Sequence, residues 1–193
     1  MNQKESRLTI KEMALTAVMS AVLCVLAPLS LPIGPVPISL ATLFVYISVY
    51  VLGTRLGTLS VVIYLLLGAV GLPVFSGYSG GIFKLAGPTG GYLIGYIPLA
   101  IISGIFVHRF AMKIVPSILG MIVGTAVLYA LGTAWLAMSA SMEFTAALAA
   151  GVIPFIPGDL VKIAVTAIVG PRLCAALSRA HVNSREEAPG RVD

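Results

Sequence analysis

A long stretch without charged side chains near the start of the chain is the feature that most constrains its fold. No Asp, Glu, Lys or Arg occurs between Glu12 and Arg55, and apolar segments recur to about Leu177. Of the 193 residues, 59% are hydrophobic and 10% are charged, whereas a soluble domain carries about 25% charged residues. The mean hydropathy is +1.04. This pattern excludes an ordinary soluble globule and predicts one integral membrane domain over residues 1–180, followed by a polar cytoplasmic tail over 181–193.

Clusters of proline and glycine divide the apolar sequence into six predicted transmembrane helices, so the expected fold class is all-α. A span needs roughly 20 apolar residues. The predicted helices cover residues 9–27, 38–52, 58–72, 92–110, 116–139 and 157–177. Thr9 and Glu12 have the spacing of a capping box at the start of the first helix. The apolar segment 144–156 is too short to cross a bilayer at about 1.5 Å per residue, so we expect it to lie at the outer surface or to re-enter.

The basic residues fall almost entirely on one side of this predicted topology. Ten of the twelve precede the first helix, join the second to the third or the fourth to the fifth, or close and follow the sixth: Lys4, Arg7, Lys11, Arg55, Arg109, Lys113, Arg172, Arg179, Arg185 and Arg191. The positive-inside rule places this side in the cytoplasm. We therefore expect a multi-pass protein of the bacterial cell membrane, in contact with the lipid bilayer, with both termini cytoplasmic. The same distribution accounts for the net charge of +5 without a nucleic-acid partner.

Four charged residues are expected on the outer half: Lys84, Glu143, Asp159 and Lys162. Ionisable groups in a membrane domain are costly unless they are paired or functional. Asp159 and Lys162 are three residues apart, so they share one face of a helix. They form either a purely local ion pair near a helix N-terminus or a binding pair, in which Asp159 accepts hydrogen bonds from an otherwise apolar ligand and Lys162 donates to it.

The glycine-rich segment 71–91 precedes the fourth predicted helix. It is suited either to folding over a ligand as a lid or to forming a rigid cap over the helix ends. Its residues 77–80 (GYSG) match the G-x-S-G pattern of rhomboid-type intramembrane proteases, so a serine hydrolase centred on Ser79 is the alternative function. A serine nucleophile needs a base within hydrogen-bond reach, and both histidines, His108 and His181, are expected at the cytoplasmic side.

The remaining motifs predict neither a metal site nor a bound cofactor. Cys24 and Cys174 lie in separate apolar segments, without the spacing of metal ligands. Residues 87–91 (GPTGG) lack the Gly-Lys-Ser/Thr ending of a phosphate-binding loop, and the sequence contains no ATPase motif.

Small residues at helical spacing predict close helix packing. The pairs Gly91 with Gly95 and Gly120 with Gly124 allow two helices to approach within the monomer. A stripe of alanines lies on one face of the first predicted helix: Ala14, Ala17 and Ala21. This stripe is suited either to the same internal packing or to docking of another membrane protein.

Four segments together resemble the BioY family, the biotin-specific S components of energy-coupling factor (ECF) transporters. They are residues 34–40 (GPVPISL), 71–77 (GLPVFSG), 87–93 (GPTGGYL) and 157–162 (PGDLVK). The resemblance implies a six-helix S-component fold that captures biotin from the outside, with no enzymatic activity of its own. It also implies a partner module of a transmembrane coupling protein and two cytoplasmic ATPases, which would explain why the chain has no nucleotide motif.

Carried over by motif, the resemblance implies a set of biotin-binding residues: Asp159, Lys162, Tyr92, Phe75, Ser79, Gly80 and Gly81. Lys84 is a further candidate, which either meets the ligand carboxylate or reaches interfacial water. The ureido N–H groups of biotin suit Asp159, its ureido carbonyl suits Lys162, and its carboxylate suits Lys84. The family pattern also implies that the alanine stripe contacts the coupling protein.

The chain departs from the family pattern at two positions. Ala41 stands where Gln is common, and Ser79 stands where some members carry Asn. A different vitamin as the ligand would keep the fold and change only the pocket.

Overall fold

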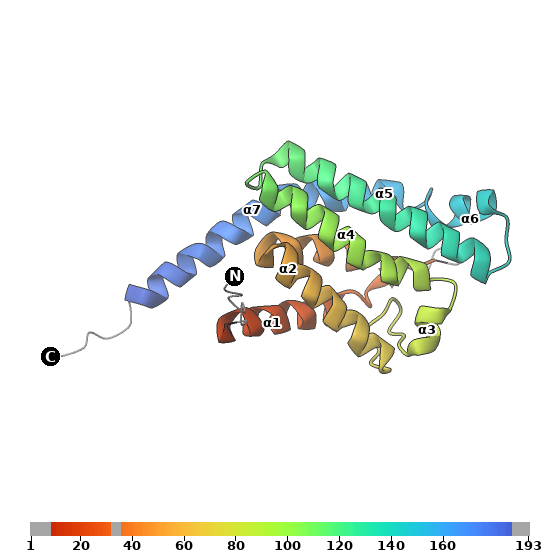
Figure 1. The fold of residues 1–193 in the computed structure, drawn as a ribbon, viewed down its shortest axis with the longest axis horizontal. Helices are drawn as coiled ribbons and strands as arrows, with labels where there is room; N and C mark the ends of the chain where they lie inside the picture. The colour runs from red at the N-terminus through yellow and green to blue at the C-terminus, as the bar shows by residue number, and fades with distance from the viewer. Residues whose placement is uncertain (1–8, 32–35, 187–193) are drawn as a thin grey trace, which may run out of the picture.

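The computed structural model describes residues 9–31 and 36–186, with side chains through Arg179. In these residues all regular structure is helical apart from one short hairpin (Figure 1). The helices are α1 (Ile10–Leu26), α2 (Ala41–Ala69), α3 (Ile82–Ala86), α4 (Gly90–Arg109), α5 (Ile114–Ser139), α6 (Phe144–Gly151) and α7 (Ile156–Glu186). Lys4, Arg7, Arg191 and residues 34–35 of the first family motif lie outside the described residues.

The prediction of six spans is not confirmed. Within the described ranges, four helices are long and apolar enough to cross a membrane: α2, α4, α5 and Ile156–Arg179 of α7. α1 has only 17 residues. α2 is a single element of 29 residues where two helices were expected.

A backbone break at Gly53 divides α2. Gly53 has φ 83° and ψ 170°, a conformation open to glycine but outside the helical region. Beyond it, Gly57 packs so closely against Val49 that a Cβ atom at Gly57 would lie 2.7 Å from the Val49 Cα. The chain therefore folds back at this point, and the two parts of α2 run in different directions (Figure 1). The turn expected at residues 53–57 is present as this break.

Several helix boundaries differ from the prediction. The second helix was expected from residue 38, but Ile38–Ser39 forms strand β2, which pairs antiparallel with β1 (Ser30–Leu31) in the register Ser30 to Ser39. α2 begins only at Ala41. α7 was expected to end at residue 177 but continues to Glu186, because no glycine or proline, the residues least favourable in a helix, occurs between residues 177 and 186. The start of α1 is as predicted, with both hydrogen bonds of the capping box between Thr9 and Glu12.

Four helices lie side by side in the order α1, α2, α4, α5, and α7 crosses them to contact α2 and α5 (Figure 1). α4 is the central helix and packs on both α2 and α5. Glycines permit its contact with α5: a Cβ atom at Gly91 would lie 2.3 Å from the Trp135 Cβ, and one at Gly120 would lie 2.2 Å from the Phe106 Cβ. The predicted glycine packing within the monomer is confirmed.

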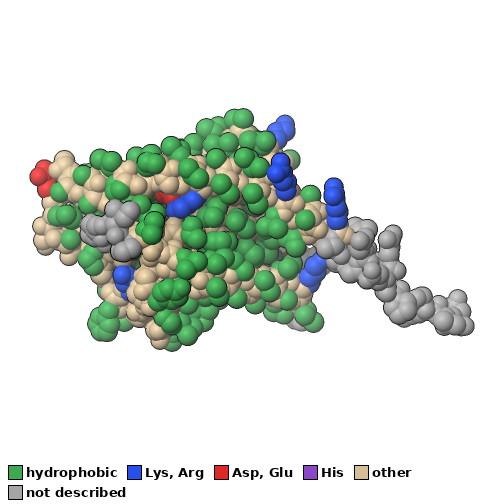
Figure 2. Space-filling model, turned by 180° about the vertical axis from the view of Figure 1, so that it is seen from behind, with side chains coloured by type: hydrophobic (Ala, Val, Ile, Leu, Met, Phe, Trp, Pro, Cys, Tyr) green, Lys and Arg blue, Asp and Glu red, His purple; other side chains and the backbone are tan. Residues whose placement is uncertain are grey.

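The face of the molecule that Figure 2 shows is largely hydrophobic. Large apolar side chains such as Val70, Phe83 and Met138 are more than four-fifths exposed. Soluble monomers rarely expose large contiguous apolar patches, so this surface is suited to lipid. With the four candidate spans, it supports a multi-pass membrane protein.

Candidate binding site

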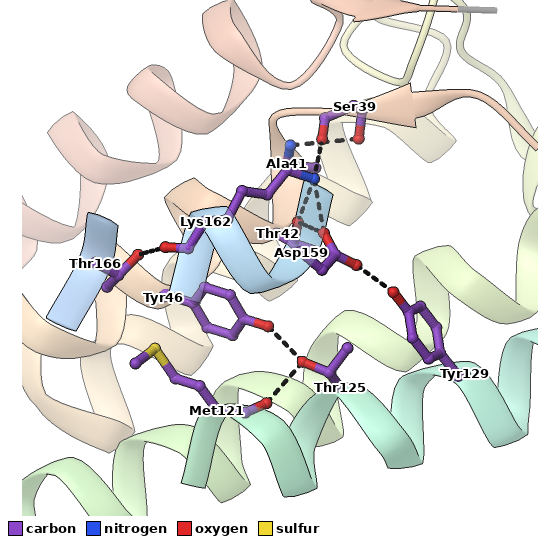
Figure 3. A network of polar contacts seen from close by, with 10 residues as sticks. All are labelled: Ser39, Ala41, Thr42, Tyr46, Met121, Thr125, Tyr129, Asp159, Lys162 and Thr166. Atoms are coloured by element: carbon purple, nitrogen blue, oxygen red, sulfur yellow. Dashed lines mark hydrogen bonds and ion pairs between the residues drawn. The ribbon is translucent and has the colours of Figure 1, made fainter. Parts of the chain in front are cut away.

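Asp159 and Lys162 lie on the first turns of α7 and form an ion pair, with 2.8 Å between Lys162 Nζ and Asp159 Oδ1. Their spacing of three residues puts both on the helix face that turns toward α2 and α5 (Figure 3). The two side chains are only 6% and 11% exposed. The prediction that the two residues share one helix face is therefore confirmed, and the ion pair between them fits both a local role and a binding role.

Three further residues complete the hydrogen bonding of this pair (Figure 3). Lys162 Nζ donates to the Ser39 carbonyl oxygen at 2.7 Å and to Thr42 Oγ1 at 3.0 Å. The Thr42 hydroxyl donates to Asp159 Oδ1 at 3.2 Å. The Tyr129 hydroxyl donates to Asp159 Oδ2 at 2.6 Å. The pair thus joins β2, α2, α5 and α7, four segments that are distant in sequence.

Burying such an ion pair without hydrogen-bond partners would destabilise the folded protein. Leaving one charge of a buried pair unpaired typically destabilises a protein by about 3–5 kcal/mol. Here each charge has at least three hydrogen bonds, so the ion pair is compatible with its dry surroundings.

The pair lines a cavity of about 40 Å³. A second cavity of about 30 Å³ adjoins it. Four residues line both cavities, namely Val36, Pro37, Tyr92 and Tyr96. The first cavity also contains Phe155 in its wall, and the second is lined by Phe75, Ser76 and Lys84. The two cavities are thus compartments of one site, with the ion pair at one end and Lys84 at the other.

The structure brings five of the eight predicted ligand residues to this site or its wall. Asp159, Lys162, Tyr92, Phe75 and Lys84 each line one or both compartments. Tyr92 is anchored by its hydroxyl, which donates to the Gly151 carbonyl oxygen at 3.1 Å. Phe75 is fully buried and packs edge-on against Tyr64, with 5.6 Å between ring centroids.

The other three predicted ligand residues hold the shape of the glycine-rich turn. Ser79 forms a bridge with Phe75, donating its backbone N–H to the Phe75 carbonyl at 3.3 Å and accepting from the Phe75 N–H at 2.9 Å. Gly80 lies so close to Leu72 that a Cβ atom there would be 2.2 Å from the Leu72 carbonyl oxygen. The backbone N–H of Gly81 donates to the Gly68 carbonyl at 2.7 Å. These contacts set the position of Phe75.

The serine hydrolase alternative is not supported. The Ser79 hydroxyl donates to the Ser76 carbonyl oxygen at 2.8 Å, within its own turn. His108, the histidine whose side chain is described, lies at the far end of α4 and contacts the Val49 carbonyl oxygen at 2.7 Å. α4 has 20 residues, which at 1.5 Å per residue is about 30 Å of helix between the two ends.

The alanine stripe of α1 is exposed. Ala14, Ala17 and Ala21 all face outward, whereas Thr16, Ser20 and Leu23 form the buried face of the helix. Ser20 Oγ donates to the Ser60 carbonyl oxygen at 3.2 Å, which ties this buried face to α2. The stripe therefore does not serve the internal packing of the monomer.

Sequence reasoning did not identify Ser39, Thr42, Tyr129 or Tyr96 as site residues. Serine, threonine and tyrosine are common in apolar helices, and nothing in their spacing distinguishes these four. The one available signal was Ser39, which lies inside a family motif at residues 34–40.

Comparisons with known proteins agree on one family. The BioY family model matches residues 1–179. A probable biotin transporter BioY of Pyrococcus horikoshii is 42% identical over 163 residues, which cover 84% of this chain and 96% of the relative. The biotin transporter BioY of Thermotoga maritima is 38% identical over 167 residues, which cover 85% and 96%. A crystal structure of the S-component for biotin from an ECF-type ABC transporter superposes with a TM-score of 0.79 at 29% identity, covering 90% of this chain and 94% of that one.

Proposed function

Because this chain belongs to the BioY family, we propose that it is the biotin-binding membrane subunit of an ECF transporter. The chain is a transport subunit and not an enzyme. It captures biotin on the outer side of the bacterial cell membrane, and both of its termini lie in the cytoplasm. Similarity to biotin transporters and to a biotin S-component supports this function.

The observation that carries the proposal is the buried Asp159–Lys162 pair at the wall of a cavity. Biotin offers ureido N–H donors to the Asp159 carboxylate and a ureido carbonyl to the Lys162 ammonium. A ligand that displaces a partner of the pair without offering these groups leaves a buried charge with poorer hydrogen bonding, which gives the site selectivity.

Lys162 exchanges a partner when biotin binds. An ammonium group has three N–H donors, and those of Lys162 already serve the Ser39 carbonyl, Thr42 and Asp159. The ureido carbonyl therefore takes the place of one of these acceptors.

The rest of the ligand extends into the second compartment. The thioether ring and aliphatic chain of biotin lie between Tyr92 and Phe75, and the carboxylate reaches Lys84. Ser79, Gly80 and Gly81 cover the chain through their turn. Ligand sites typically enclose about 300–1,000 Å³, so the side chains shared by the two compartments move apart on binding.

The partner is an energising module of a transmembrane coupling protein and two cytoplasmic ATPases. The exposed stripe of Ala14, Ala17 and Ala21 is the contact with the coupling protein, because small side chains let two helices approach closely in a membrane.

Equilibrium binding of tritiated biotin to the purified chain tests the function. We expect saturable binding of one biotin per chain, displaced by unlabelled biotin and unaffected by excess riboflavin or thiamine. Displacement by either of the other vitamins, with no preference for biotin, would contradict the assigned ligand.

A further inference from the structure

The two carboxylate oxygens of Asp159 have different numbers of partners. Oδ1 accepts from Lys162 at 2.8 Å and from Thr42 at 3.2 Å. Among the described residues, Oδ2 accepts from Tyr129 alone, at 2.6 Å. An ionised carboxylate accepts about four hydrogen bonds, two on each oxygen. The remaining acceptor capacity of Asp159 therefore lies on Oδ2, beside the Tyr129 hydroxyl.

The direction of each hydrogen bond is fixed. Thr42 accepts from Lys162, so its own hydrogen goes to Asp159. The Tyr129 hydroxyl donates, because an ionised carboxylate has no hydrogen to give. The terminal torsion of an aspartate side chain is broad, and the two bonds to Oδ1 leave the carboxylate free to swing about that oxygen. The bond from Tyr129 removes this freedom.

Tyr129 also lies between two cavities and lines both of them. It lines the cavity of about 40 Å³ together with Asp159. The same two residues line an apolar groove of about 190 Å³ between α5 and α7, which opens at the side of the helix bundle. Tyr129 is half-buried, and its hydroxyl turns inward to Asp159 (Figure 3). The hydrogen bond thus fixes the position of Oδ2 where these two spaces adjoin.

We propose that Tyr129 is a specificity-determining positioning residue, which orients Asp159 Oδ2 so that the site selects a ligand presenting an N–H donor to that oxygen. Tyr129 comes from α5 and acts through Asp159 on α7. The selected ligand class is a cyclic urea or similar ring amide with an unsubstituted nitrogen. This inference rests on the proposed function, because it assigns one ureido N–H of biotin to Oδ2.

The test compares Tyr129→Phe with the native full-length chain, using biotin and its two derivatives methylated at one or the other ureido nitrogen. The native chain should reject one of the methylated isomers strongly, because methylation leaves Oδ2 without its donor. Without Tyr129 the ligand itself must order the carboxylate, and immobilising one side chain costs about 0.5–1.5 kcal/mol, so Tyr129→Phe should lower biotin affinity by up to about 10-fold. Affinity for the rejected isomer should change less than about threefold, so the selectivity ratio falls.

Tyr46→Phe is the matched control. Tyr46 is buried on α2, and its hydroxyl pairs with Thr125, away from Asp159 (Figure 3). This variant should keep the native selectivity ratio. In an Asp159→Asn background, Tyr129→Phe should have little further effect, because the two side chains act as one unit.

Three results would overturn the inference. Equal losses for biotin and both methylated isomers would assign Tyr129 a purely structural role, and native affinities for all three ligands would show that Tyr129 has no role in binding. In both cases tight native binding of biotin would leave the proposed function standing. A native chain that does not bind biotin would overturn the proposed function and this inference with it.

Discussion

Asp159 and Lys162 are buried charges in a chain with very few charged residues. Replacing a buried ion pair by apolar residues often costs a protein nothing in stability. The pair is therefore poorly explained as a device for holding α7 in place. A binding role explains both the burial and the ring of polar partners that keeps each charge oriented.

Lys84 allows the proposed contact with the ligand carboxylate to be tested separately from the ion pair. It lies on α3, half-buried, at the opposite end of the site from the ion pair. Lys84→Gln should weaken biotin binding by roughly tenfold, since it removes a charge-assisted hydrogen bond to the ligand carboxylate. Affinity for biotin methyl ester should change little.

The matched control for this change is Lys113→Gln, because Lys113 is an exposed lysine next to α5 at the other end of α4. Competition binding with the acid and the ester measures both variants. If Lys84→Gln weakened the binding of biotin and of its methyl ester equally, Lys84 would not contact the ligand carboxylate.

The sequence identifies the charged residues of the site but not their partners. Asp159 and Lys162 stand out because charge is rare in apolar segments. Thr42 and Tyr129 are 117 and 30 residues away from Asp159. Their contacts depend on how α2 and α5 pack against α7, which local spacing does not encode. Ser79, Gly80 and Gly81 match a motif by type, but their contacts shape a turn.

At the scale of elements, α1 has two distinct faces. One face carries Thr16 and Ser20 and packs on α2, while the alanine stripe faces outward. An exposed row of small side chains is unusual for a lipid-facing surface, which large apolar residues cover better. The stripe is suited to close contact with another helix.

Ala17→Leu should therefore reduce assembly without affecting the binding site. A larger side chain on a closely packed surface costs about 1–3 kcal/mol, so the amount of coupling module that co-purifies should fall by roughly tenfold. Biotin binding by the isolated subunit should remain native. Quantitative co-purification of tagged protein from membranes measures the first effect.

Ala146→Leu provides the comparison, because Ala146 is an exposed alanine on α6. It should leave assembly unchanged. Undiminished co-purification with Ala17→Leu would show that the coupling protein binds elsewhere.

The elements differ in how well the sequence predicts them. The capping box at Thr9 fixes the start of α1 because its two hydrogen bonds are local. The hairpin of β1 and β2 was missed, since each strand has two residues and shows no alternation. The turn near Gly53 was expected from its glycines, but the helical geometry on either side of the break merges the two helices into one element.

On the scale of the whole molecule, basic side chains gather at one end of the surface (Figure 2). Lys11, Arg55, Arg109 and Lys113 lie near the start of α1, the break in α2 and the connection between α4 and α5. The ion pair and Lys84 lie toward the opposite end. By the positive-inside rule, this asymmetry supports the proposal that the site faces outward.

A reporter fused after residue 193 tests that orientation. A green fluorescent protein fusion should be fluorescent in intact cells, and an alkaline phosphatase fusion at the same position should be inactive, because the positive-inside rule predicts a cytoplasmic C-terminus. The same pair of reporters at residue 142, before α6, should give the opposite result. An active phosphatase at the C-terminus would contradict the proposed topology and place the C-terminus outside the cell.

Equilibrium binding of tritiated biotin to site variants tests most directly whether the buried Asp159 carboxylate and the buried Lys162 ammonium bind biotin. Asp159→Asn and Lys162→Ala should each weaken binding by about 100-fold or more, because each leaves a buried charge or ligand group without its partner. Glu143→Gln, which changes an exposed acid before α6, should bind normally, and thermal unfolding checks that the variants are folded. Near-native biotin affinity in both site variants would contradict the account.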